Sequence, residues 1–302
     1  MMGSKLVLAA VILLAFGGSY LGKIAIDSER DRYVGRSGRI VSLAPSITET
    51  LFALGLDDKV AGVTRFCDYP PAAQTKVRVG GYFDPNYEAI VALDPEFVVV
   101  LEEHLGERPY LERLGFTVLV VDHKTISGIL DSVSSIGALC GAEQVAAELV
   151  GKLRGEMAAV REQIGNAHRP SVMISVGRST GRGSIQDVIV ASEGSFFGEM
   201  VELAGGTNSY TDHTLYPAIS KEGIMRLDPE IIIDLIPEFD GEQATAELLD
   251  EWNAIAGVRA VQNKRVHIFS QKYASIPGPR FIQTLKDLAS VIHPGAIKEN
   301  PH

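Results

Sequence analysis

The chain has 302 residues, of which 46% are hydrophobic and 22% are charged, a composition typical of globular proteins rather than disordered ones. Its formal net charge of −10 at pH 7 argues against nucleic acid as a partner, because binding to phosphates requires a basic surface and the sequence has no basic cluster. The length is sufficient for two ordinary domains.

The first 30 residues have the features of an export signal. Lys5 precedes an uncharged, mostly apolar run from Leu6 to Gly22, and the small residues at 17–19 suit a cleavage site. No cysteine follows the run, which excludes a lipid-modified cysteine there. We therefore predict an exported, periplasmic or extracytoplasmic protein, whose residues 1–30 are either removed as a signal peptide or retained as an N-terminal anchor. A retained segment would be its contact with the membrane.

The folded region is predicted to begin at residue 38 with a strand, a turn and a helix. Ser46 and Glu49 fit the S-x-x-E pattern of a capping box, which favours a helix start at Ser46. Alternating strands and helices then predict an N-terminal α/β lobe over 38–142, with a parallel sheet covered on both faces. Its strands are expected at 39–43, 60–63, 97–101 and 117–121.

A long helix is predicted over 143–166. Apolar residues recur there every three or four positions and form one stripe, as on a helix about 30 Å long. Such a helix is either an ordinary core helix or a bridge between two lobes, and the second alternative gives it the role of a linking helix. The predicted stripe consists of Val145, Leu149, Leu153, Met157, Val160 and Ile164.

Beyond this helix the alternation of strands and helices restarts, which predicts a C-terminal α/β lobe over 167–295. Strands are expected at 172–176, 231–235 and 266–269, and a helix at 196–204. The chain is therefore predicted to form two similar Rossmann-like lobes with parallel sheets, joined by one long rigid α-helix.

An internal repeat supports the two-lobe prediction. "EAIVALDPEFVVV" begins at Glu88 and "EGIMRLDPEIIID" at Glu222, with six of 13 positions identical at a constant offset of 134 residues. Asn86 and Ser220 are good N-cap residues, and the Asp-Pro pair is expected to end each helix. A glutamate in the first turn stabilises a helix by about 0.3–1 kcal/mol through the helix dipole, which explains each copy locally.

Known catalytic and metal-binding patterns are absent from the sequence. It contains no G-x-S-x-G or H-E-x-x-H motif, and the glycine-rich stretch at 177–184 does not fit a P-loop or a dinucleotide fingerprint. Cys67 and Cys140 lie far apart without CxxC spacing, and we expect two buried or half-buried free thiols, with one disulfide between them as the alternative. We therefore predict no enzyme activity, no resident cofactor and no metal site.

Several stretches together resemble one family. They are "RIVSLAPSITETLFALG", "RFCDYPPAA", "VGGYFDPNYEAIVALDPEFVVV", "YPAISKEGIMRLDPEIII" and "PGPRFIQTLKDLASVIHP". The region from about 38 to 293 resembles the periplasmic substrate-binding proteins of ABC importers for cobalamin, haem and ferric siderophores. The resemblance implies two α/β lobes with a ligand cleft between them, and delivery of a small-molecule metal chelate to a dimeric membrane permease with its ATPase.

The resemblance also implies roles for individual residues. Glu88 and Glu222 match the exposed glutamates, one per lobe, that pair with arginines of the permease. Phe66, Tyr82 and Tyr216 match positions that contact the corrin ring in the cobalamin binder. That protein has tryptophans at the positions of Tyr82 and Tyr216. Four further residues match no family motif, and they are the candidates to meet the carboxylates of haem or the oxygens of a ferric siderophore if one of these is the ligand instead: Arg65, His104, Arg178 and Tyr273.

The favoured ligand is cobalamin or another corrinoid, because "DYPPAA" and the Tyr-Pro pair before Glu222 most resemble the cobalamin binder. Haem or a ferric siderophore is the alternative within the same importer class. Two other functions stay open: an exported module that serves a sensor, and an enzyme on the same two-lobed scaffold, since a fold alone does not fix function.

Overall fold

The computed structural model describes residues 38–181, 183–237 and 242–296. The predicted export segment at residues 1–30 lies outside the described residues. Within the described ranges, no helix has both the length and the apolar character needed to cross a membrane.

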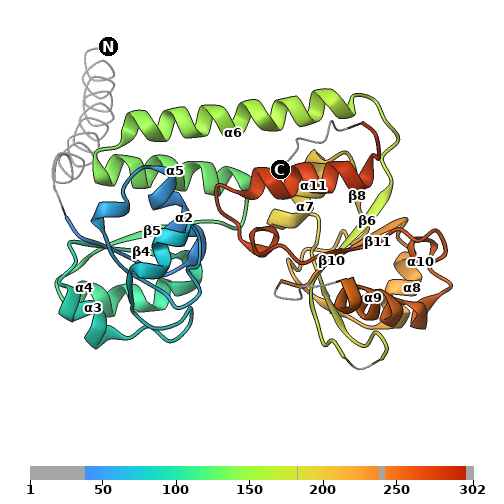
Figure 1. Cartoon of the computed structure of the whole chain (residues 1–302), viewed down its shortest axis with the longest axis horizontal. Helices are drawn as coiled ribbons and strands as arrows, with labels where there is room; N and C mark the ends of the chain where they lie inside the picture. Colours follow the sequence, from blue (N-terminus) through green and yellow to red (C-terminus); the bar gives the residue numbers. More distant parts are fainter. Residues whose placement is uncertain (1–37, 182, 238–241, 297–302) are drawn as a thin grey trace, which may run out of the picture.

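Two α/β lobes lie side by side, and helix α6 runs along both of them (Figure 1). The sheet of the N-terminal lobe has the strand order β3-β2-β1-β4-β5, and every neighbouring pair is parallel, as predicted. Its strands are β1 (Ile40–Ser42), β2 (Val60–Val63), β3 (Val77–Arg78), β4 (Phe97–Leu101) and β5 (Thr117–Val121), and its helices are α2 (Pro45–Ala53), α3 (Tyr87–Leu93), α4 (Arg108–Arg113) and α5 (Ile126–Cys140).

The sheet of the C-terminal lobe has the order β11-β10-β6-β7-β9, with β8 also paired to β6. Strands β11, β10, β6 and β8 are parallel, whereas β7 pairs antiparallel with both β6 and β9. The prediction of a parallel sheet is therefore wrong for β7, and neither β7 nor β9 was predicted. The strands are β6 (Ser171–Arg178), β7 (Val188–Val190), β8 (Thr207–Asn208), β9 (Ala218–Ile219), β10 (Ile231–Leu235) and β11 (Val266–Phe269); the helices are α7 (Phe196–Leu203), α8 (Lys221–Leu227), α9 (Glu242–Glu251), α10 (Arg259–Gln262) and α11 (Phe281–Ile292).

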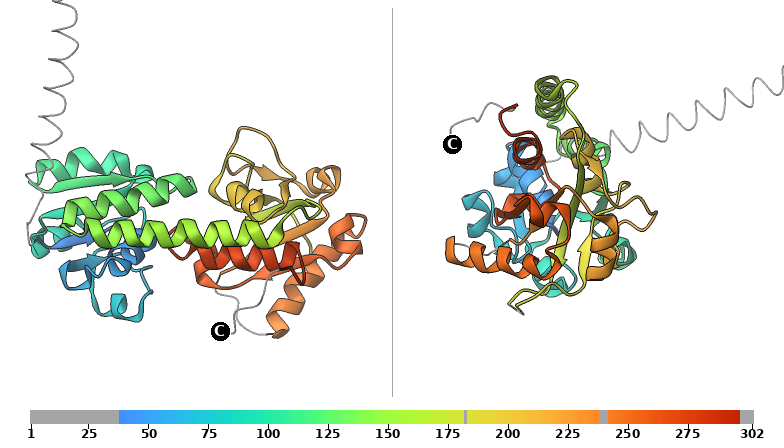
Figure 2. Two further views of the ribbon diagram at one scale, coloured as in Figure 1. Left: turned by 90° about the horizontal axis from the view of Figure 1, so that it is seen from above. Right: turned by 90° about the vertical axis from the view of Figure 1, so that its right-hand side faces the viewer.

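Helix α6 (Glu143–Ile164) packs on α5 in the N-terminal lobe and on α7 and α11 in the C-terminal lobe (Figure 2). Its buried face differs from the predicted stripe: Val145 is 42% exposed, and Ala146 and Val150 are buried in its place. A run of four-residue steps drifts around a helix with 3.6 residues per turn, whereas alternating steps of four and three stay on one face. The buried face therefore follows the positions 146, 150, 153, 160 and 164.

One hydrophobic core spans both lobes. On β4, Phe97 and Val99 belong to this shared core, whereas Val98 and Val100 point into a separate core beneath α3 and α4. The shared core continues through α5, α6, α7 and α11 into the C-terminal sheet, whose other face packs around Trp252. Because α6 is buried against both lobes, it is part of the core and not a free tether.

The repeated segments form matching helix–strand units. Helices α3 and α8 are each capped by a side chain: Asn86 accepts from the N–H of Ala89 at 3.0 Å, and Ser220 accepts from that of Gly223 at 3.4 Å. Each helix ends at an aspartate with left-handed backbone angles, Asp94 at φ 44° and Asp228 at φ 43°. The predicted caps and helix ends are confirmed.

Each of these aspartates is also held by an arginine from elsewhere in its lobe. Arg39 donates to the carbonyl of Asp94 at 2.9 Å and to its carboxylate at 2.7 Å. Arg259 does the same at Asp228, at 2.6 Å and 2.8 Å. The clamp satisfies a helix-terminal carbonyl that would otherwise be left unpaired, which gives the Asp-Pro repeat a structural reason in addition to its helix-ending role.

The predicted capping box at Ser46 and Glu49 is wrong. Helix α2 begins at Pro45, and its N-cap is Ala44, two residues before the predicted cap Ser46; Ala44 provides no side-chain cap. Proline has no N–H to satisfy in the first turn, so the helix start needs fewer acceptors there. The two polar side chains instead bind residues outside the helix. A hydrogen bond of 2.8 Å joins Ser46 Oγ to His123 Nδ1, and Glu49 binds Arg280.

The pair of Glu49 and Arg280 joins the two halves of the chain. Arg280, at the start of α11, donates to both carboxylate oxygens of Glu49 at 2.9 and 2.5 Å, and the Glu49 side chain is only 2% exposed. Beside them Gly278 lies so close to α2 that an added Cβ would be 3.2 Å from the Cα of Ser46. Burial raises the pKa of Glu49 despite Arg280, so the pair is costly to bury and its value lies in fixing the approach of the two lobes.

We expect Arg280→Met to lower the free energy of unfolding by about 3 kcal/mol, because it leaves the Glu49 carboxylate buried without its partner. The double variant Glu49→Leu/Arg280→Met should recover most of that loss. Urea unfolding followed by circular dichroism measures both. A loss below about 1 kcal/mol for Arg280→Met, or a double variant weaker than both single variants, would contradict the assignment.

A pH effect follows from His123, whose pKa burial lowers from 6.5 to about 4. The unfolded chain then takes up a proton near pH 6.5 that the folded chain refuses until about pH 4. Stability is therefore unaffected above pH 6.5 and falls as the pH drops through this window, by up to about 3 kcal/mol. Urea unfolding at pH 7.5 and pH 4.5 should show a smaller acid loss in His123→Gln than in the native protein. His168→Gln, which alters an exposed histidine, is the control. If the native protein and His123→Gln lose the same free energy of unfolding between pH 7.5 and pH 4.5, the pH effect does not come from His123.

Candidate ligand cleft and docking helices

An aromatic cluster lies on the N-terminal lobe. The ring of Tyr82 packs edge-on against Phe83, with centroids 4.7 Å apart, and against His104, at 4.5 Å. Phe83 is 79% exposed, whereas His104 is buried. Burial lowers the pKa of His104, so its imidazole is neutral near pH 7 and functions as an aromatic support for Tyr82.

Tyr216 is the corresponding predicted residue of the C-terminal lobe, and it is 41% exposed. Burial is the largest cause that raises the pKa of Tyr216, and the charges of Glu103 and Glu199 raise it further. Burial followed by the charge of Glu103 also raises the pKa of Tyr82, to about 12. Both phenols therefore lie within range of the same carboxylate, Glu103, although they belong to different lobes.

Phe66 and Arg65 lie on the segment after β2. Phe66 is 51% exposed, and the guanidinium of Arg65 sits over its ring, 5.2 Å from the centroid. Arg65 also donates to both carboxylate oxygens of Asp84 at 2.8 Å. The ring of Phe66 is thus available for contact, while the charge of Arg65 is already neutralised.

Arg178 is not presented to solvent. Its side chain is 1% exposed and forms ion pairs with Asp234, at 2.7 Å, and with Glu251. Trp252 donates to the same Asp234 at 3.0 Å, and the guanidinium lies over its ring. All of these groups lie inside the C-terminal lobe, so Arg178 holds that lobe together.

Tyr273 lies at the junction of the lobes. It is on the 3-10 helix η5 (Lys272–Ser275), its hydroxyl donates to Asp287 at 2.7 Å, and its ring lies near the guanidinium of Arg280. Arg280 also stacks on Tyr69, 3.7 Å from the ring centroid. The surroundings of Tyr273 are therefore those of the ion pair between the lobes.

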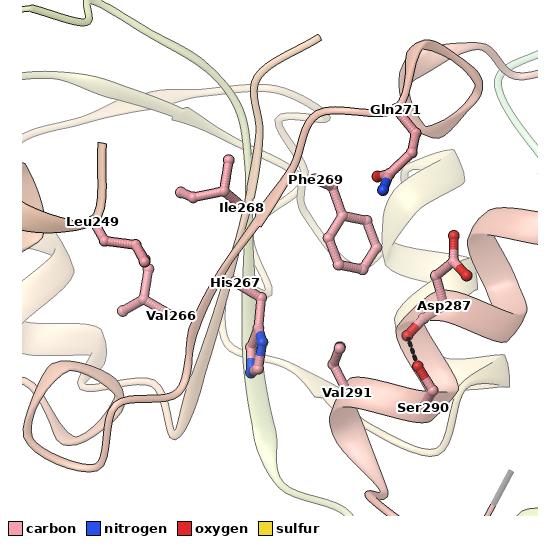
Figure 3. Close-up of a pocket in the computed structure, with 9 residues that line it drawn as sticks. All are labelled: Leu249, Val266, His267, Ile268, Phe269, Gln271, Asp287, Ser290 and Val291. Atoms are coloured by element: carbon pink, nitrogen blue, oxygen red, sulfur yellow. Dashed lines mark hydrogen bonds between the residues drawn. The ribbon is translucent and has the colours of Figure 1, made fainter. Parts of the chain in front are cut away.

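Two hollows on the C-terminal lobe lie apart from the predicted residues. One of about 390 Å³ lies against the edge strand β11, between His267 and Asp287 (Figure 3). Two of its polar side chains are used internally, because Asp287 accepts from Tyr273 and Ser290 donates to the carbonyl of Asp287, whereas Nε2 of His267 is buried without a hydrogen-bond partner. The other, of about 450 Å³, is formed by 193–194 and 211–213, close in sequence to Tyr216.

The two predicted docking glutamates lie on equivalent helices. Glu88 on α3 and Glu222 on α8 are both exposed, and each follows the N-cap residue by two positions. The two helices are on the side of the molecule opposite α6, one on each lobe (Figure 1). At Glu222, hydrogen bonds to its own backbone N–H and to Ser220 lower the pKa, so this carboxylate is charged even at mildly acidic pH.

Three residues were missed by the sequence reasoning. Phe83, Glu103 and Glu199 surround the two tyrosines, but none belongs to a pattern with a specific meaning. The adjacent aromatics in "GGYFDP" could have indicated Phe83. No signal in the sequence could have paired Glu199 with the N-terminal lobe, where it accepts from the N–H of Ile126 at 2.7 Å.

Comparisons with known proteins agree with this architecture. The uncharacterized ABC transporter substrate-binding lipoprotein YvrC of Bacillus subtilis (strain 168) is 32% identical over 270 residues, which are 86% of this chain and 82% of YvrC. The solved structure of the periplasmic vitamin B12 binding protein of Vibrio cholerae superposes with a TM-score of 0.72 at 26% identity, covering 86% of this chain and 98% of that one.

A periplasmic haem-binding protein from Pseudomonas aeruginosa is equally similar, with a TM-score of 0.75 and 25% identity over 87% of this chain and 95% of that one. The relatives named here are binding proteins rather than enzymes. The model of the periplasmic binding protein family matches residues 40–273. Since that match covers most of the chain, the chain belongs to the periplasmic binding protein family.

Proposed function

We propose that the protein captures a metal chelate outside the cytoplasmic membrane, held between its two lobes, and delivers it to the permease of an ABC importer. The observation that carries the proposal is the set of aromatic side chains on the two lobes: Phe66 and Phe83 are exposed on the N-terminal lobe beside the half-buried Tyr82, and Tyr216 is exposed on the C-terminal lobe. The names of the similar proteins support a transport role, and a corrinoid is the favoured ligand.

The aromatic surface suits a broad, flat ligand. Phe66, Tyr82, Phe83 and Tyr216 expose ring area to the surroundings, and aromatic rings provide large contact at low conformational cost. A corrin or porphyrin ring would be held by faces and edges of this kind. Haem is therefore the second candidate, and its binding is favoured by the similarity to a haem-binding protein.

Arg178 and Tyr273 are left out of the proposed contact surface. The first is buried among carboxylates and the second is engaged at the lobe junction. His104 and Arg65 are retained as supporting residues, because they position Tyr82 and Phe66. The proposed contact residues are therefore Phe66, Tyr82, Phe83 and Tyr216.

Glu88 and Glu222 are the proposed docking residues. They are exposed, lie on matching helices of the two lobes and have no ion-pair partner among the residues that the structure describes. Two like charges at equivalent positions suit a permease with two related subunits, where such pairs set orientation and association rate more than affinity. A sensor partner would bind the same face, which carries α3 and α8. A permease dimer also explains why one exposed glutamate lies at the equivalent position of each lobe.

Titration of the purified protein with cyanocobalamin, haemin and ferric siderophores should show saturable quenching of tyrosine fluorescence by one of them, with a Kd below about 10 μM. Tyr82→Ala and Tyr216→Ala should each weaken binding of the chelate by about tenfold, since each removes an aromatic contact with the ligand from one lobe. Tyr110→Ala removes an exposed aromatic of α4 and is the matched control. Binding of none of the chelates would reject the proposal.

Reversal of both docking charges, in Glu88→Lys/Glu222→Lys, should reduce uptake of the bound chelate by at least about tenfold while the Kd for the chelate stays unchanged. Uptake is measured in cells or in vesicles that contain the permease. Glu148→Lys/Glu162→Lys makes the same charge change on α6 and should leave uptake intact. Native rates of uptake in the first double variant would show that these helices do not contact the permease.

A further inference from the structure

Two carboxylates beside the proposed contact surface form no direct ion pair among the residues that the structure describes. Glu103 is exposed on the 3-10 helix η3 (Glu102–Glu107) of the N-terminal lobe, and Glu199 is on α7 of the C-terminal lobe. Within 38–181, 183–237 and 242–296, neither forms an ion pair with Lys, Arg or His. Glu199 accepts an N–H of the N-terminal lobe, from Ile126 at the start of α5, which fixes its position between the lobes.

Both charges act on the proposed contact surface. Glu103 is adjacent in sequence to His104, whose ring packs 4.5 Å from that of Tyr82. Burial is the main cause that raises the pKa of Tyr216, and Glu103 and Glu199 both add to it. A ligand seated between Tyr82 and Tyr216 would therefore lie in a field set by two carboxylates.

Most cations of this region are paired with carboxylates. Arg65 binds Asp84 at 2.8 Å, and two cations near the lobe junction, Lys272 and Arg280, bind Asp68 and Glu49.

Lys124 binds Glu102 at 2.6 Å. This hydrogen bond and the charges of Glu102, Glu103 and Asp122 raise the pKa of Lys124, so one cation is shared among three carboxylates. Arg78 differs, because it donates to the carbonyls of Thr64 and Cys67, at 2.8 and 3.0 Å. The surface therefore offers exposed aromatic rings beside an excess of carboxylates over cations.

We propose, on the basis of the function proposed above, that the ligand is a metal chelate without net negative charge, neutral or cationic, and that Glu103 and Glu199 discriminate against anionic chelates. A negative group brought beside an unneutralised carboxylate at the rim of a protein cleft loses about three- to tenfold in affinity per carboxylate at low ionic strength. Arg65 would offset this only by leaving Asp84.

The test compares chelates that differ in charge but share a scaffold. The corrinoid series is cyanocobalamin, its monocarboxylic acid and cationic aquacobalamin. The haem series is haemin and its dimethyl ester, and the iron series is ferrioxamine B with its neutral N-acetyl and anionic N-succinyl forms. Each is titrated into the native protein and into Glu103→Gln, Glu199→Gln and the double variant, with Glu162→Gln on α6 as the control for a lost charge.

In whichever scaffold binds, we expect the native protein to bind the anionic member more weakly than the neutral or cationic one. Each glutamine substitution should tighten binding of the anionic member by about three- to tenfold, keep the neutral member within about twofold, and lose its effect at about 0.5 M salt. Glu162→Gln should change nothing. Glu103→Gln alters an exposed residue, so it carries the test alone if Glu199→Gln fails to fold.

The inference is overturned if the native protein binds the anionic member at least as tightly as the others, or if the glutamine variants shift all members of a scaffold equally. Those outcomes leave chelate capture intact. Failure of the native protein to bind any member of any scaffold would instead reject the proposed function itself, so the two failures are distinguishable.

Discussion

The buried pair of Glu49 and Arg280 fixes how the two lobes meet, and much of the remaining arrangement follows from it. Removing two charges from water is costly, so the pair is retained only because its geometry is good and Gly278 lets the chain pass close to α2. Around it, α6 and α11 contribute to a core shared by both lobes. The lobes are therefore bound by packing as well as by one ion pair, and a hinge would have to open a continuous core.

The fixed arrangement of the lobes also sets the positions of the proposed ligand contacts and docking residues. Tyr82 and Tyr216 belong to different lobes, and the charge of Glu103 raises the pKa of each, less than burial does, because the lobes approach closely. The helices α3 and α8, which carry Glu88 and Glu222, belong to the same rigid frame (Figure 1). A single arrangement can thus present a ligand and two docking charges together, without a large conformational change.

The sequence predicted those parts of the fold that depend on local pattern. The internal repeat, the caps Asn86 and Ser220 and the continuous apolar strand at 97–101 each have a short-range cause and a matching element in the structure. Prediction from the sequence failed where a side chain's role depends on a partner that is distant in the chain. Ser46 and Glu49 have the form of a capping box, but tertiary contacts with His123 and Arg280 take both side chains. The roles of Arg178 and of Glu199 likewise depend on partners more than 50 residues away.

A fixed arrangement of the two lobes sets one distance between α3 and α8, which can be measured. Spin labels on Val91→Cys and Met225→Cys, both half-exposed positions, report it by pulsed electron resonance, while the buried Cys67 and Cys140 should react slowly. Rigidly held lobes should give one narrow distance that a saturating chelate changes by less than about 2 Å, and a broader distribution in Arg280→Met. A larger shift in the native protein, or two separated distances before ligand is added, would contradict it.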